Sequence, residues 1–424
     1  MKNVLFIVYY FPPMGGSGVQ RPLKFVKYLR DFGWNPIVLC PEPGAYHTFD
    51  ESLQEELESL NLEIYRVKAG TPFHKGGKTQ RKVTLPPWLD NAMRRISMFF
   101  WLPDNKTGWI GPAVQEAIKI TNEKKIEIIF STAAPYSNHI IARVLKQKLA
   151  LPVVMDLRDE WLESHLIHYA TPFHRNKMAK IEKETLSKAD CITVINKETQ
   201  SSISHRFNDS DVRLIRQGFD PEDFLLPQET HRNHKKLRFL YSGLFYGKRK
   251  PDIFLKAVNA LIDEKPWLKD IIELQFQGGL PKETIGLIQQ LALSDIVTDY
   301  GYVNHKIAVR NLMNADILWF MVGHLTHSDK VTVGKMFEYF GTGKPILGLV
   351  PEGGAKELLK SYKSSYITNP YSEAGIKDAI ESILSDWNDN ALPSPNQGFI
   401  QKYDRKEITR ELADIFNEIS TKSL

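Results

Sequence analysis

The sequence predicts an α/β protein made of two Rossmann-like, doubly wound domains that face each other across a cleft, and three observations lead to this prediction. Short apolar runs alternate with amphipathic helical patterns through most of the 424 residues, which is typical of parallel sheets covered by helices on both faces. A glycine-rich loop follows the first apolar run. A polar, charged stretch near residue 230 divides the alternation into two series, in a chain too long for one ordinary core.

The first series opens with a buried strand over Val4–Tyr9 and a glycine-rich loop over 11–18. An amphipathic helix follows over Val19–Phe32, Gly33 ends it, and Pro36–Cys40 is the next strand. This order is typical of a doubly wound domain, whose ligand crevice lies at the carboxyl ends of the strands. Further helices are expected at about 109–122, 136–149 and 174–188, and further strands at Ile126–Phe130, Pro152–Met155, Cys191–Ile195 and Arg213–Arg216.

The second series begins after the polar stretch Leu226–Lys236, which we interpret as an interdomain linker. An N-terminal domain is therefore expected over 1–225 and a C-terminal domain over 226–400. The segment 401–424 contains a polar amphipathic helix over Asp404–Ile419. The expected strands of the second domain are Leu237–Ser242, Ile271–Gln277, Ile296–Tyr300, Ile317–Met321 and Pro345–Val350.

Composition excludes several classes of protein. The net charge of +5 is modest for this length, so nucleic acid is not an expected partner. No run of about 18 apolar residues is present, so no transmembrane helix is expected, and the apolar N-terminus is too short for a signal peptide. Cys40 and Cys191 form neither a disulfide framework nor a metal-ligand spacing. We therefore expect a cytoplasmic protein without a bound metal.

The stretch Thr332–Leu347 is predicted to form a binding site for a nucleotide. It has the pattern of a loop, a short helix, a tight turn and a buried strand. The start of the helix would present backbone N–H groups near Gly334 and Lys335, and such groups attract anions. Glu338, one turn later, can accept hydrogen bonds from a polyol. An anion site beside a hydroxyl acceptor suits a ribose with a diphosphate.

Two further loops could contact phosphate. The loop containing Gly15 and Gly16 is either a backbone cradle for a phosphate or transferred group, or an ordinary turn between strand and helix. After the strand that ends at Ser242, Gly243 opens a turn that carries Lys248 and Arg249. Cations at the carboxyl end of a strand suit a diphosphate, although most basic triplets are solvated turns.

Charged residues also follow the Pro152–Met155 strand. Arg158 and Asp159 could recognise hydroxyl groups, or Arg158 could pair with Asp156 or Asp159 and only brace the loop. His139 is a candidate general base because an unperturbed imidazole titrates near neutrality. The alternative is that His139 is a cap or packing residue at the start of a helix.

Residues 75–106 form a basic, aromatic insertion. The segment contains seven Lys or Arg against two Asp, an excess equal to the net charge of the whole chain. Apolar residues recur in it at helical spacing. One hypothesis is an interfacial helix that meets an anionic membrane surface; the alternative is a helix packed on the core beneath a solvated basic loop.

Taken in order, these stretches resemble the retaining glycosyltransferases of family 4, which have the GT-B fold, and in particular the subset that builds bacterial surface polysaccharides. The resemblance extends along nearly the whole chain. Its motifs are Phe11–Gly16, Asp156–Trp161, Gly218–Phe224, Gly243 with its basic turn, Gly301–Val303 and Lys335–Pro345.

The resemblance implies that the C-terminal domain binds a nucleotide sugar and the N-terminal domain holds the acceptor. The final helix would cross back to the N-terminal domain. Glu338 matches the second of two family glutamates and would bind the ribose hydroxyls, whereas Lys330 stands at the position of the first. The donor-binding residues implied are Gly15, Gly243, Lys248, Arg249, Tyr302, Val303, Val333, Gly334, Lys335 and Glu338.

The implied reaction transfers a sugar, with retention at the anomeric carbon and without a metal or cofactor, from a UDP- or GDP-sugar to a glycan or lipid-linked acceptor. The leaving phosphate oxygen would act as base. The residues implied in catalysis are Gly16, His139, Arg158, Asp159 and Arg249. Two alternatives remain open, namely a GT-B sugar-nucleotide epimerase and a non-catalytic sugar-nucleotide-binding protein.

Overall fold

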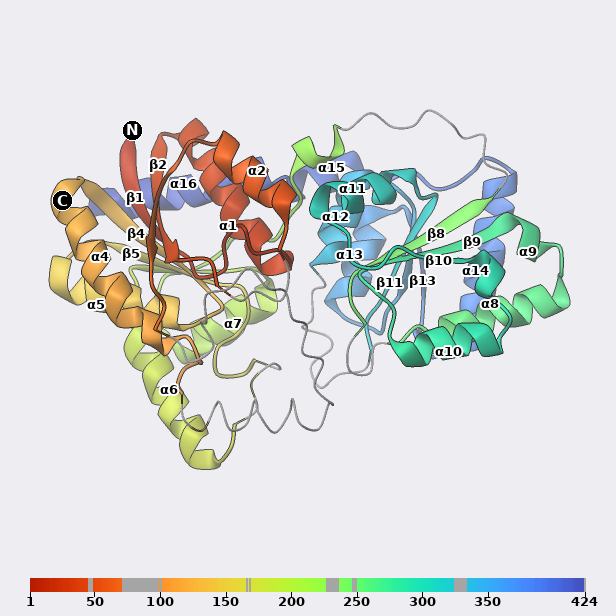
Figure 1. The fold of residues 1–424 in the computed structure, drawn as a ribbon, viewed down its shortest axis with the longest axis horizontal. Coiled ribbons are helices and arrows are strands. Elements are labelled where there is room, and N and C mark those ends of the chain that lie inside the picture. The colour runs from red at the N-terminus through yellow and green to blue at the C-terminus, as the bar shows by residue number, and fades with distance from the viewer. Residues whose placement is uncertain are drawn as a thin grey trace. The chain divides into compact units, whose positions relative to one another are not determined.

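The computed structural model describes residues 1–44, 49–70, 99, 101–164, 167, 169–225, 236–245, 250–323 and 334–422. The chain forms two compact units, one comprising Met1–Gln217 with Lys406–Leu424 and the other Gly218–Arg405. Each unit is a parallel sheet with helices on both faces (Figure 1). The prediction of an α/β chain with two Rossmann-like, doubly wound domains is therefore confirmed. Among the described residues, no helix combines the length and the apolar character needed to cross a membrane.

Within the described residues, the first unit contains a sheet of seven parallel strands in the order β3-β2-β1-β4-β5-β6-β7. Leu5 of β1 lies beside Ile37 of β2 and Ile129 of β4. The strands are β1 (Lys2–Ile7), β2 (Trp34–Pro41), β3 (Glu63–Val67), β4 (Ile126–Ala133), β5 (Val153–Leu157), β6 (Cys191–Val194) and β7 (Val212–Leu214).

Alternate residues of β1 enter two separate cores, which is why this strand is apolar throughout. Val4 and Phe6 pack with α1, α2 and α16 on one face, whereas Leu5 and Ile7 pack with α4, α5, α6 and α7 on the other. Gly33 ends the first helical segment in the left-handed conformation, with φ of 83°. The helices are α1 (Ser17–Tyr28), α2 (Glu51–Ser59), α4 (Ile110–Glu123), α5 (Ser137–Leu149), α6 (Pro172–Leu186), α7 (Lys197–Arg206) and α16 (Arg405–Lys422).

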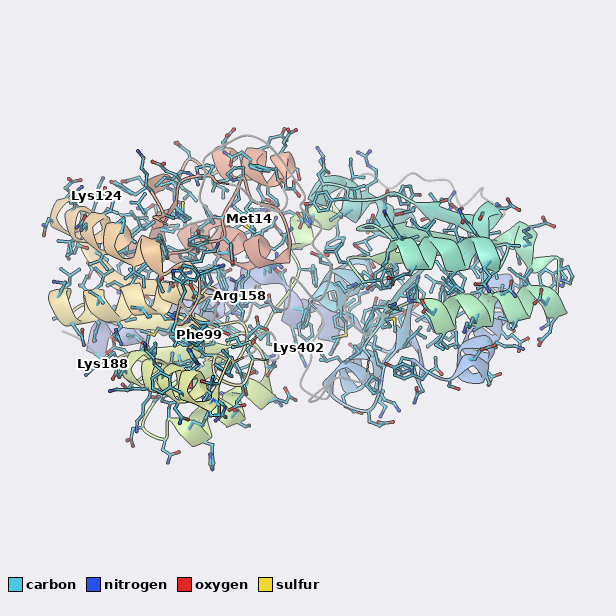
Figure 2. All side chains as sticks on the ribbon, turned by 60° about the horizontal axis from the view of Figure 1, so that its bottom comes forward. Met14, Phe99, Lys124, Arg158, Lys188 and Lys402 are labelled. Carbon is cyan, nitrogen blue, oxygen red and sulfur yellow. The ribbon has the colours of Figure 1, made fainter. Side chains whose placement is uncertain are left out.

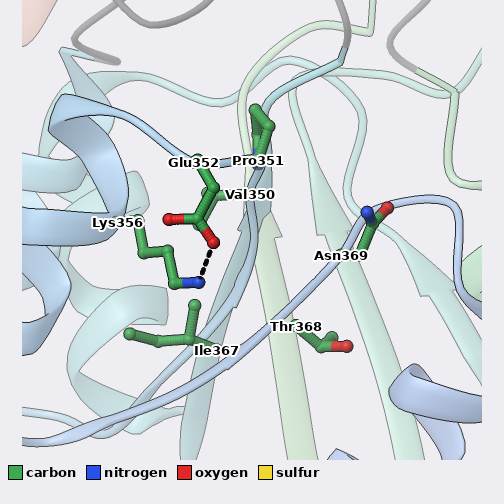
Figure 3. A pocket seen from close by; sticks show the side chains of 7 residues that line it. All are labelled: Val350, Pro351, Glu352, Lys356, Ile367, Thr368 and Asn369. Atoms are coloured by element: carbon green, nitrogen blue, oxygen red, sulfur yellow. Dashed lines mark hydrogen bonds and ion pairs between the residues drawn. The ribbon is translucent and has the colours of Figure 1, made fainter.

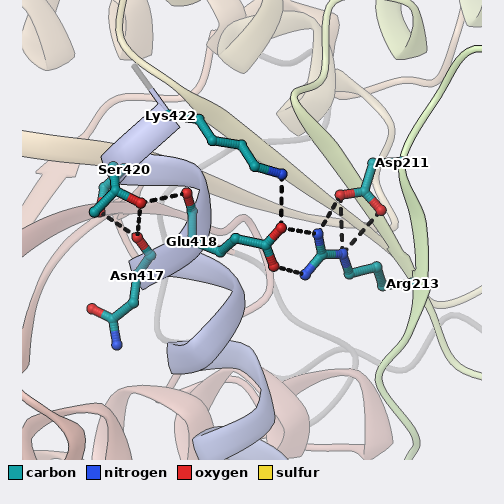
Figure 4. Close-up of polar contacts among 7 residues, drawn as sticks. Asp211, Arg213, Asn417, Glu418, Ser420 and Lys422 are labelled. Carbon is teal, nitrogen blue, oxygen red and sulfur yellow. Dashed lines mark hydrogen bonds and ion pairs between the residues drawn. The ribbon is translucent and has the colours of Figure 1, made fainter. Parts of the chain in front are cut away.

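The C-terminal helix α16 is an integral part of the first unit. Ile408, Leu412 and Phe416 are nearly or fully buried in the core that contains β1. On its outer face Glu418 accepts hydrogen bonds from Arg213 of β7, with Nη2–Oε1 at 2.8 Å (Figure 4). Burial and this ion pair together fix the end of the chain against the N-terminal sheet.

In the described part of the second unit, six parallel strands lie in the order β10-β9-β8-β11-β12-β13. The chain first adds strands on one side of β8 and then continues from β11 on the other side. The strands are β8 (Leu237–Ser242), β9 (Ile272–Gln277), β10 (Val297–Asp299), β11 (Ile317–Met321), β12 (Ile346–Leu349) and β13 (Ser365–Thr368).

The helices of the second unit share one hydrophobic core with this sheet. Trp319 of β11 lies at its centre and stacks on Phe254 of α8, with ring centroids 4.1 Å apart. The helices are α8 (Asp252–Glu264), α9 (Leu268–Ile271), α10 (Lys282–Gln290), α11 (His305–Asn314), α12 (Lys335–Thr342), α13 (Gly354–Tyr362), α14 (Glu373–Asn388) and α15 (Gln397–Ile400).

The boundary between the units lies at 217/218 and not at the expected 225/226. Phe219 explains the difference. Its side chain is 5% exposed and packs in the core of the second unit. Its backbone pairs with the segment where the chain returns to the first unit, because its N–H donates to the carbonyl of Tyr403 and its carbonyl accepts from the N–H of Arg405. The expected linker Leu226–Lys236 lies, except for Lys236, outside the described residues, as does most of the insertion 75–106.

Candidate functional site

The candidate site lies in the second unit, at the carboxyl ends of β8 and β11. At this point the strand order reverses, since β9 and β10 lie on one side of β8 and β11 lies on the other. Ligands of open α/β sheets bind in the crevice outside the strands at such a switch point. The loop after β8 begins with Gly243, and the segment after β11 leads into α12.

Glycines occur on the β8 side of this site because the loop after β8 and the loop after β9 are in contact there. The N–H of Gly243, with φ of 122°, donates to Gln277 at 2.7 Å, and the N–H of Gly278, with φ of 115°, donates to Gly301 at 2.7 Å. A Cβ atom added to Gly278 would lie 2.6 Å from the backbone of Gly243. Both positive φ and this close approach require glycine.

Helix α12 is fixed against the two central strands through Tyr339. The Tyr339 hydroxyl accepts a hydrogen bond from the N–H of Ser242 at 2.9 Å and donates one to the carbonyl of Trp319 at 3.2 Å. The helix begins at Lys335 after Gly334, which provides no side-chain cap. Lys335 and Glu338 therefore both belong to the first turn of α12, the end of a helix at which backbone N–H groups generally attract anions.

Lys335 and Glu338 project from the first turn of α12. The Lys335 Nζ lies 3.8 Å from the ring centroid of Tyr241, the residue two positions before Gly243. Glu338, one turn later, is half-buried, and it makes no hydrogen bond or ion pair among the described residues. The arrangement combines an ammonium, helix-start amides and a carboxylate. Such a set can bind a phosphate group and a neighbouring pair of hydroxyls.

The predicted donor residues fall into two groups. Lys248, Arg249, Lys330 and Val333 lie outside the described residues. Tyr302 and Val303 follow Gly301 after β10, and the Tyr302 side chain is 44% exposed. The structure brings Lys335 beside Gly243 and Tyr241 at the end of β8, and Gly334 and Glu338 belong to the start of the same helix. Tyr302 and Val303 follow β10, farther along the same sheet edge.

In the first unit, Gly16 has φ of 98° and precedes α1, and Gly15 lies just before it. Arg158, labelled in Figure 2, connects the start of α1 with the end of β4 through hydrogen bonds. Its guanidinium donates to the carbonyls of Ala133 and Ala134, each at 2.7 Å, and to that of Gly18. The loop-bracing hypothesis for Arg158 thus agrees with the structure, but its partners are backbone carbonyls rather than a carboxylate.

Asp156 has a different partner from those expected. Its carboxylate is fully buried and bound by Arg21, with Nη2–Oδ1 at 2.8 Å, and it also accepts hydrogen bonds from Thr132 and Thr193. Burial raises the pKa of Asp156, but Arg21 and these hydrogen bonds outweigh it and hold the pKa below its ordinary value. Asp159 is half-buried on the loop that follows β5.

His139 is a packing residue in this structure. The imidazole is fully buried, and its Nδ1 lies 2.8 Å from the Ser131 hydroxyl. Burial lowers the pKa of His139 to about 3, so the ring is neutral near pH 7. Because no part of the ring is exposed, the structure does not support the predicted role as general base, and the packing alternative agrees with it.

Sequence reasoning missed Asp104, which caps α5. Its carboxylate accepts hydrogen bonds from the N–H and hydroxyl of Ser137, at 2.9 and 2.6 Å. Burial raises the pKa of Asp104 and lowers that of the neighbouring Lys106. The two positions are 33 residues apart, so the sequence carries no local signal for this contact.

A hollow of about 540 Å³ also lies at the carboxyl ends of β12 and β13 (Figure 3). Glu352 and Lys356 form an ion pair on one side of it, and Thr368 and Asn369 lie on the other. No sequence motif indicated this hollow. It occupies the same edge of the sheet as Lys335, but it lies on strands farther from the switch point.

Comparison with known proteins finds a match to one family model in the second unit. Residues 223–397, most of the second unit, match the family model described as "Glycosyl transferases group 1". This match supports a GT-B glycosyltransferase that uses nucleotide-sugar donors. No curated protein sequence matches the chain.

Solved structures resemble the whole chain at low sequence identity. Sucrose-phosphate synthase from Thermosynechococcus elongatus superposes with a TM-score of 0.62 at 15% identity, covering 100% of both chains. The α,α-trehalose 6-phosphate synthase from Burkholderia multivorans gives 0.60 at 9% identity, covering 100% of this chain and 97% of the other. A protein described as a UDP-N-acetylglucosamine 2-epimerase from Listeria monocytogenes gives 0.60 at 11%, covering 97% and 95%. These likenesses establish the GT-B fold.

Proposed function

We propose that this protein is a retaining glycosyltransferase of family 4 that transfers a sugar from a nucleoside-diphosphate sugar to a hydroxyl of a glycan or lipid-linked acceptor. The observation that carries the proposal is the placement of Lys335 and Glu338, one turn apart on α12, at the switch point of the second sheet. The family-model match over 223–397 supports it independently.

The donor would lie along the first turn of α12. Its diphosphate would meet the amides after Gly334 and the Lys335 ammonium, and its ribose hydroxyls would donate to Glu338. Gly243 would let the ligand approach the end of β8 closely. Tyr302 and Val303 follow β10 in the same unit. For Gly15, Lys248, Arg249 and Val333, a contact with the donor stays a prediction from the resemblance.

The reaction would need no protein nucleophile. The acceptor hydroxyl attacks the anomeric carbon from the face that the diphosphate leaves, and the leaving phosphate oxygen accepts its proton. Cations and helix-start amides stabilise the departing diphosphate, so a metal is not required for charge neutralisation. In the first unit, Gly16 and Asp159 would contact the acceptor, and Arg158 would keep their loops in place through its three carbonyl contacts.

The biological role we propose is polysaccharide or cell-envelope glycan synthesis at the cytoplasmic face of the membrane. The basic insertion 75–106 would attract anionic lipid, since each basic residue near a charged surface contributes about 1 kcal/mol. Of its described residues, Phe99 has a side chain that is 51% exposed. Co-sedimentation with anionic vesicles that disappears at high salt is the expected result; no binding at low salt would remove this part of the proposal.

Thermal unfolding with UDP, GDP and ADP tests the donor site. A nucleotide at a hundred times its Kd stabilises the folded state by about 2.7 kcal/mol, which raises the melting temperature by several degrees. We expect such a rise with one of the three diphosphates, and a smaller rise for Glu338→Ala. Failure of all three to raise the melting temperature of the unmodified protein would refute the proposal.

An epimerase is a second candidate, because the Listeria structure shares the fold over nearly the whole chain. An epimerase consumes a nucleotide sugar without an acceptor. Incubation with the donor alone therefore separates the two: an epimerised nucleotide sugar favours the epimerase, whereas turnover that depends on an added acceptor favours the transferase. A protein that binds the donor and turns over neither way would be a non-catalytic sugar-nucleotide-binding protein.

A further inference from the structure

Lys106 and Tyr10 lie close together in the first unit, at the carboxyl ends of its central strands. Tyr10 follows β1, and Lys106 is next to the segment that binds the start of α5, the helix after β4. We propose that the Lys106 ammonium and the Tyr10 hydroxyl bind a phosphate group of the acceptor, which is then a sugar phosphate or a lipid-linked sugar phosphate rather than a neutral glycan. The inference rests on the proposed function, because it assumes that the acceptor binds at this edge of the sheet.

One aromatic ring brings the two groups together. The Lys106 Nζ lies 5.3 Å from the centroid of the Tyr9 ring. The Tyr10 ring meets the same ring edge-on, with centroids 5.3 Å apart. Tyr9 is 5% exposed and also packs against the buried Trp109, with centroids 5.5 Å apart. Lys106 and Tyr10 are therefore both placed by a ring that the core holds in position.

The Tyr10 hydroxyl is available to a ligand. It makes no hydrogen bond among the described residues, Tyr10 is only half-buried, and its oxygen is not one of the buried side-chain atoms without a partner. Burial raises the pKa of Tyr10 to about 12, and the nearby Asp104 contributes to the rise. The phenol therefore stays protonated at neutral pH and can donate a hydrogen bond.

The Lys106 ammonium forms no ion pair with a described residue. The neighbouring Asp104 carboxylate is already occupied. It accepts from the N–H and hydroxyl of Ser137 at 2.9 and 2.6 Å and from the backbone N–H of Lys106 at 2.9 Å. Burial lowers the pKa of Lys106, and Asp104 opposes this only in part. An anion bound beside the ammonium would stabilise its charged form in a place from which water is partly removed.

Arg158 adds a second cation on the other side of Tyr10. A Cβ atom on Gly18 would lie 3.7 Å from the Arg158 Nη1 and 4.0 Å from the Tyr10 Cδ2, so both side chains border this glycine. Asp156 and Asp159 act on Arg158, but neither is among the charges that shift the pKa of Tyr10. Two cations and the occupied carboxylate before Lys106 thus lie around the pair of tyrosines.

This set of groups favours a phosphate over a neutral hydroxyl. The ammonium and the phenol are both hydrogen-bond donors, and the nearby carboxylate has no role left as an acceptor for a sugar hydroxyl. A phosphate group offers several anionic oxygens, so it can accept from the ammonium and the phenol at the same time. A neutral sugar would leave the ammonium without a counter-charge.

Thermal unfolding with glucose 6-phosphate, glucose and inorganic phosphate at equal ionic strength tests the inference, first without nucleotide and then with the donor site saturated by a nucleoside diphosphate. We expect the two phosphates to raise the melting temperature and glucose not to raise it. For Lys106→Met the affinity for glucose 6-phosphate should fall by roughly ten- to a hundredfold, as for the loss of a hydrogen bond to a charged group. Lys148→Met, which removes an exposed lysine at the far end of α5, is the matched control and should leave this affinity unchanged.

Two further variants separate phosphate binding from a merely structural role. Tyr10→Phe removes only the hydroxyl, so it should keep the melting temperature of the ligand-free protein and weaken phosphate binding by roughly three- to tenfold. Lys106→Arg keeps the charge and should retain more of the affinity than Lys106→Met. Where Lys106→Met fails to fold, Tyr10→Phe still decides the question.

A lipid arm identifies the source of the phosphate. Farnesyl phosphate in detergent micelles is compared with empty micelles and with glucose 6-phosphate. A rise in melting temperature with farnesyl phosphate alone supports a lipid-linked acceptor, and a rise with glucose 6-phosphate supports a soluble one. No rise with any of the phosphates overturns the inference.

The outcomes also distinguish the inference from the function that it assumes. Phosphate probes that bind equally well to Lys106→Met and to the unmodified protein overturn the inference and leave the proposed function in place. Failure of every nucleoside diphosphate to bind overturns the proposed function, whereas the phosphate measurements made without nucleotide still report on Lys106 and Tyr10.

Discussion

Arg21 of α1 and Asp156 of β5 form a buried ion pair with two contacts, at 2.8 Å for Nη2–Oδ1 and 3.1 Å for Nε–Oδ2. Arg21 is 3% exposed and Asp156 is fully buried. Arg21 also donates to the carbonyls of Ile215 and Arg216, close to the point where the chain enters the second unit. One side chain thus connects the first helix, the central sheet and the end of the first unit.

Removing one partner of this pair should strongly destabilise the first unit. We expect Arg21→Met to lower the free energy of unfolding by about 3–5 kcal/mol, because the Asp156 carboxylate would stay buried without its counter-charge. Urea unfolding monitored by circular dichroism measures the loss. The exposed pair Arg175–Glu163 offers a control, and Arg175→Met should have a much smaller effect. Equal effects of the two changes would contradict the prediction.

Stability should fall in mild acid because of His139. Its pKa is 6.5 in the unfolded chain and about 3 in the folded protein, so between these values only the unfolded chain binds the proton. The contribution of His139 is therefore fully present above about pH 6.5 and is lost as the pH falls toward 3, with a slope of up to about 1.4 kcal/mol per pH unit.

Urea unfolding of the unmodified protein and of His139→Gln between pH 4.5 and 7 measures this effect. The difference in unfolding free energy between the two proteins should change with pH over that range. Asp156 affects stability in a lower pH range. Its pKa is lowered in the folded state, so its stabilisation of the folded protein is present above its unfolded pKa of about 3.9 and is lost as the pH falls below that value. Parallel curves for the two proteins would show that His139 does not contribute.

Glu338 should discriminate ribose from deoxyribose. Replacement by Ala removes the acceptor for the ribose hydroxyls, so we expect the affinity for a nucleoside diphosphate to fall by about tenfold, the effect of one hydrogen bond to a charged group. For the 2′-deoxy nucleotide, the affinities of the unmodified protein and of Glu338→Ala should differ by less, because one of the hydroxyls that Glu338 would accept from is absent. Competition titration measures the ratio of the two affinities, and Glu373→Ala on α14 is an exposed control. An unchanged ratio would place the ribose elsewhere.

Arg158 should affect turnover without affecting donor affinity. Lysine carries the same charge but cannot reach the three carbonyls of Gly18, Ala133 and Ala134 together. For Arg158→Lys we expect acceptor-dependent turnover to fall by at least about tenfold, since misplacement of reacting groups is costly. The Kd for the nucleoside diphosphate should not change. A weaker donor affinity with normal turnover would be the opposite of this expectation.

Two glycines of the second unit should respond oppositely to alanine. Gly278→Ala meets both an unfavourable φ of 115° and the Gly243 backbone at 2.6 Å, so a loss of about 2 kcal/mol or more is expected. Gly286 lies within α10, and a Cβ there would meet no atom within 4 Å. Gly286→Ala should therefore stabilise by about 0.5–1 kcal/mol. Chemical denaturation of both variants checks the contrast.

The hydrophobic pattern was sufficient to predict the buried strands of the two sheets. The buried strands β8 and β11 have the bounds expected from their apolar runs, because a strand covered on both faces is apolar throughout. The edge strands β3 and β13 were missed, since each is only half-buried or exposed along its length and has polar residues beside a short apolar pair, so neither forms an apolar run. Helix α2 was missed as well, although Asp50 caps its start through Ser52 and Leu53.

The sequence by itself determined the order of the elements, the two-domain fold and the position of Lys335 and Glu338 on one helical turn, because these follow from local periodicity and turn residues. Only the tertiary structure decided the partners of the charged groups. In the folded chain Arg158 donates hydrogen bonds to three backbone carbonyls, and Asp156 forms an ion pair with Arg21. His139 is buried, and the Lys335 ammonium lies over the ring of Tyr241, which is 94 positions away in the chain. Such pairings depend on which strand ends lie side by side, and this is set by the packing of the whole sheet rather than by the spacing of residues along the chain.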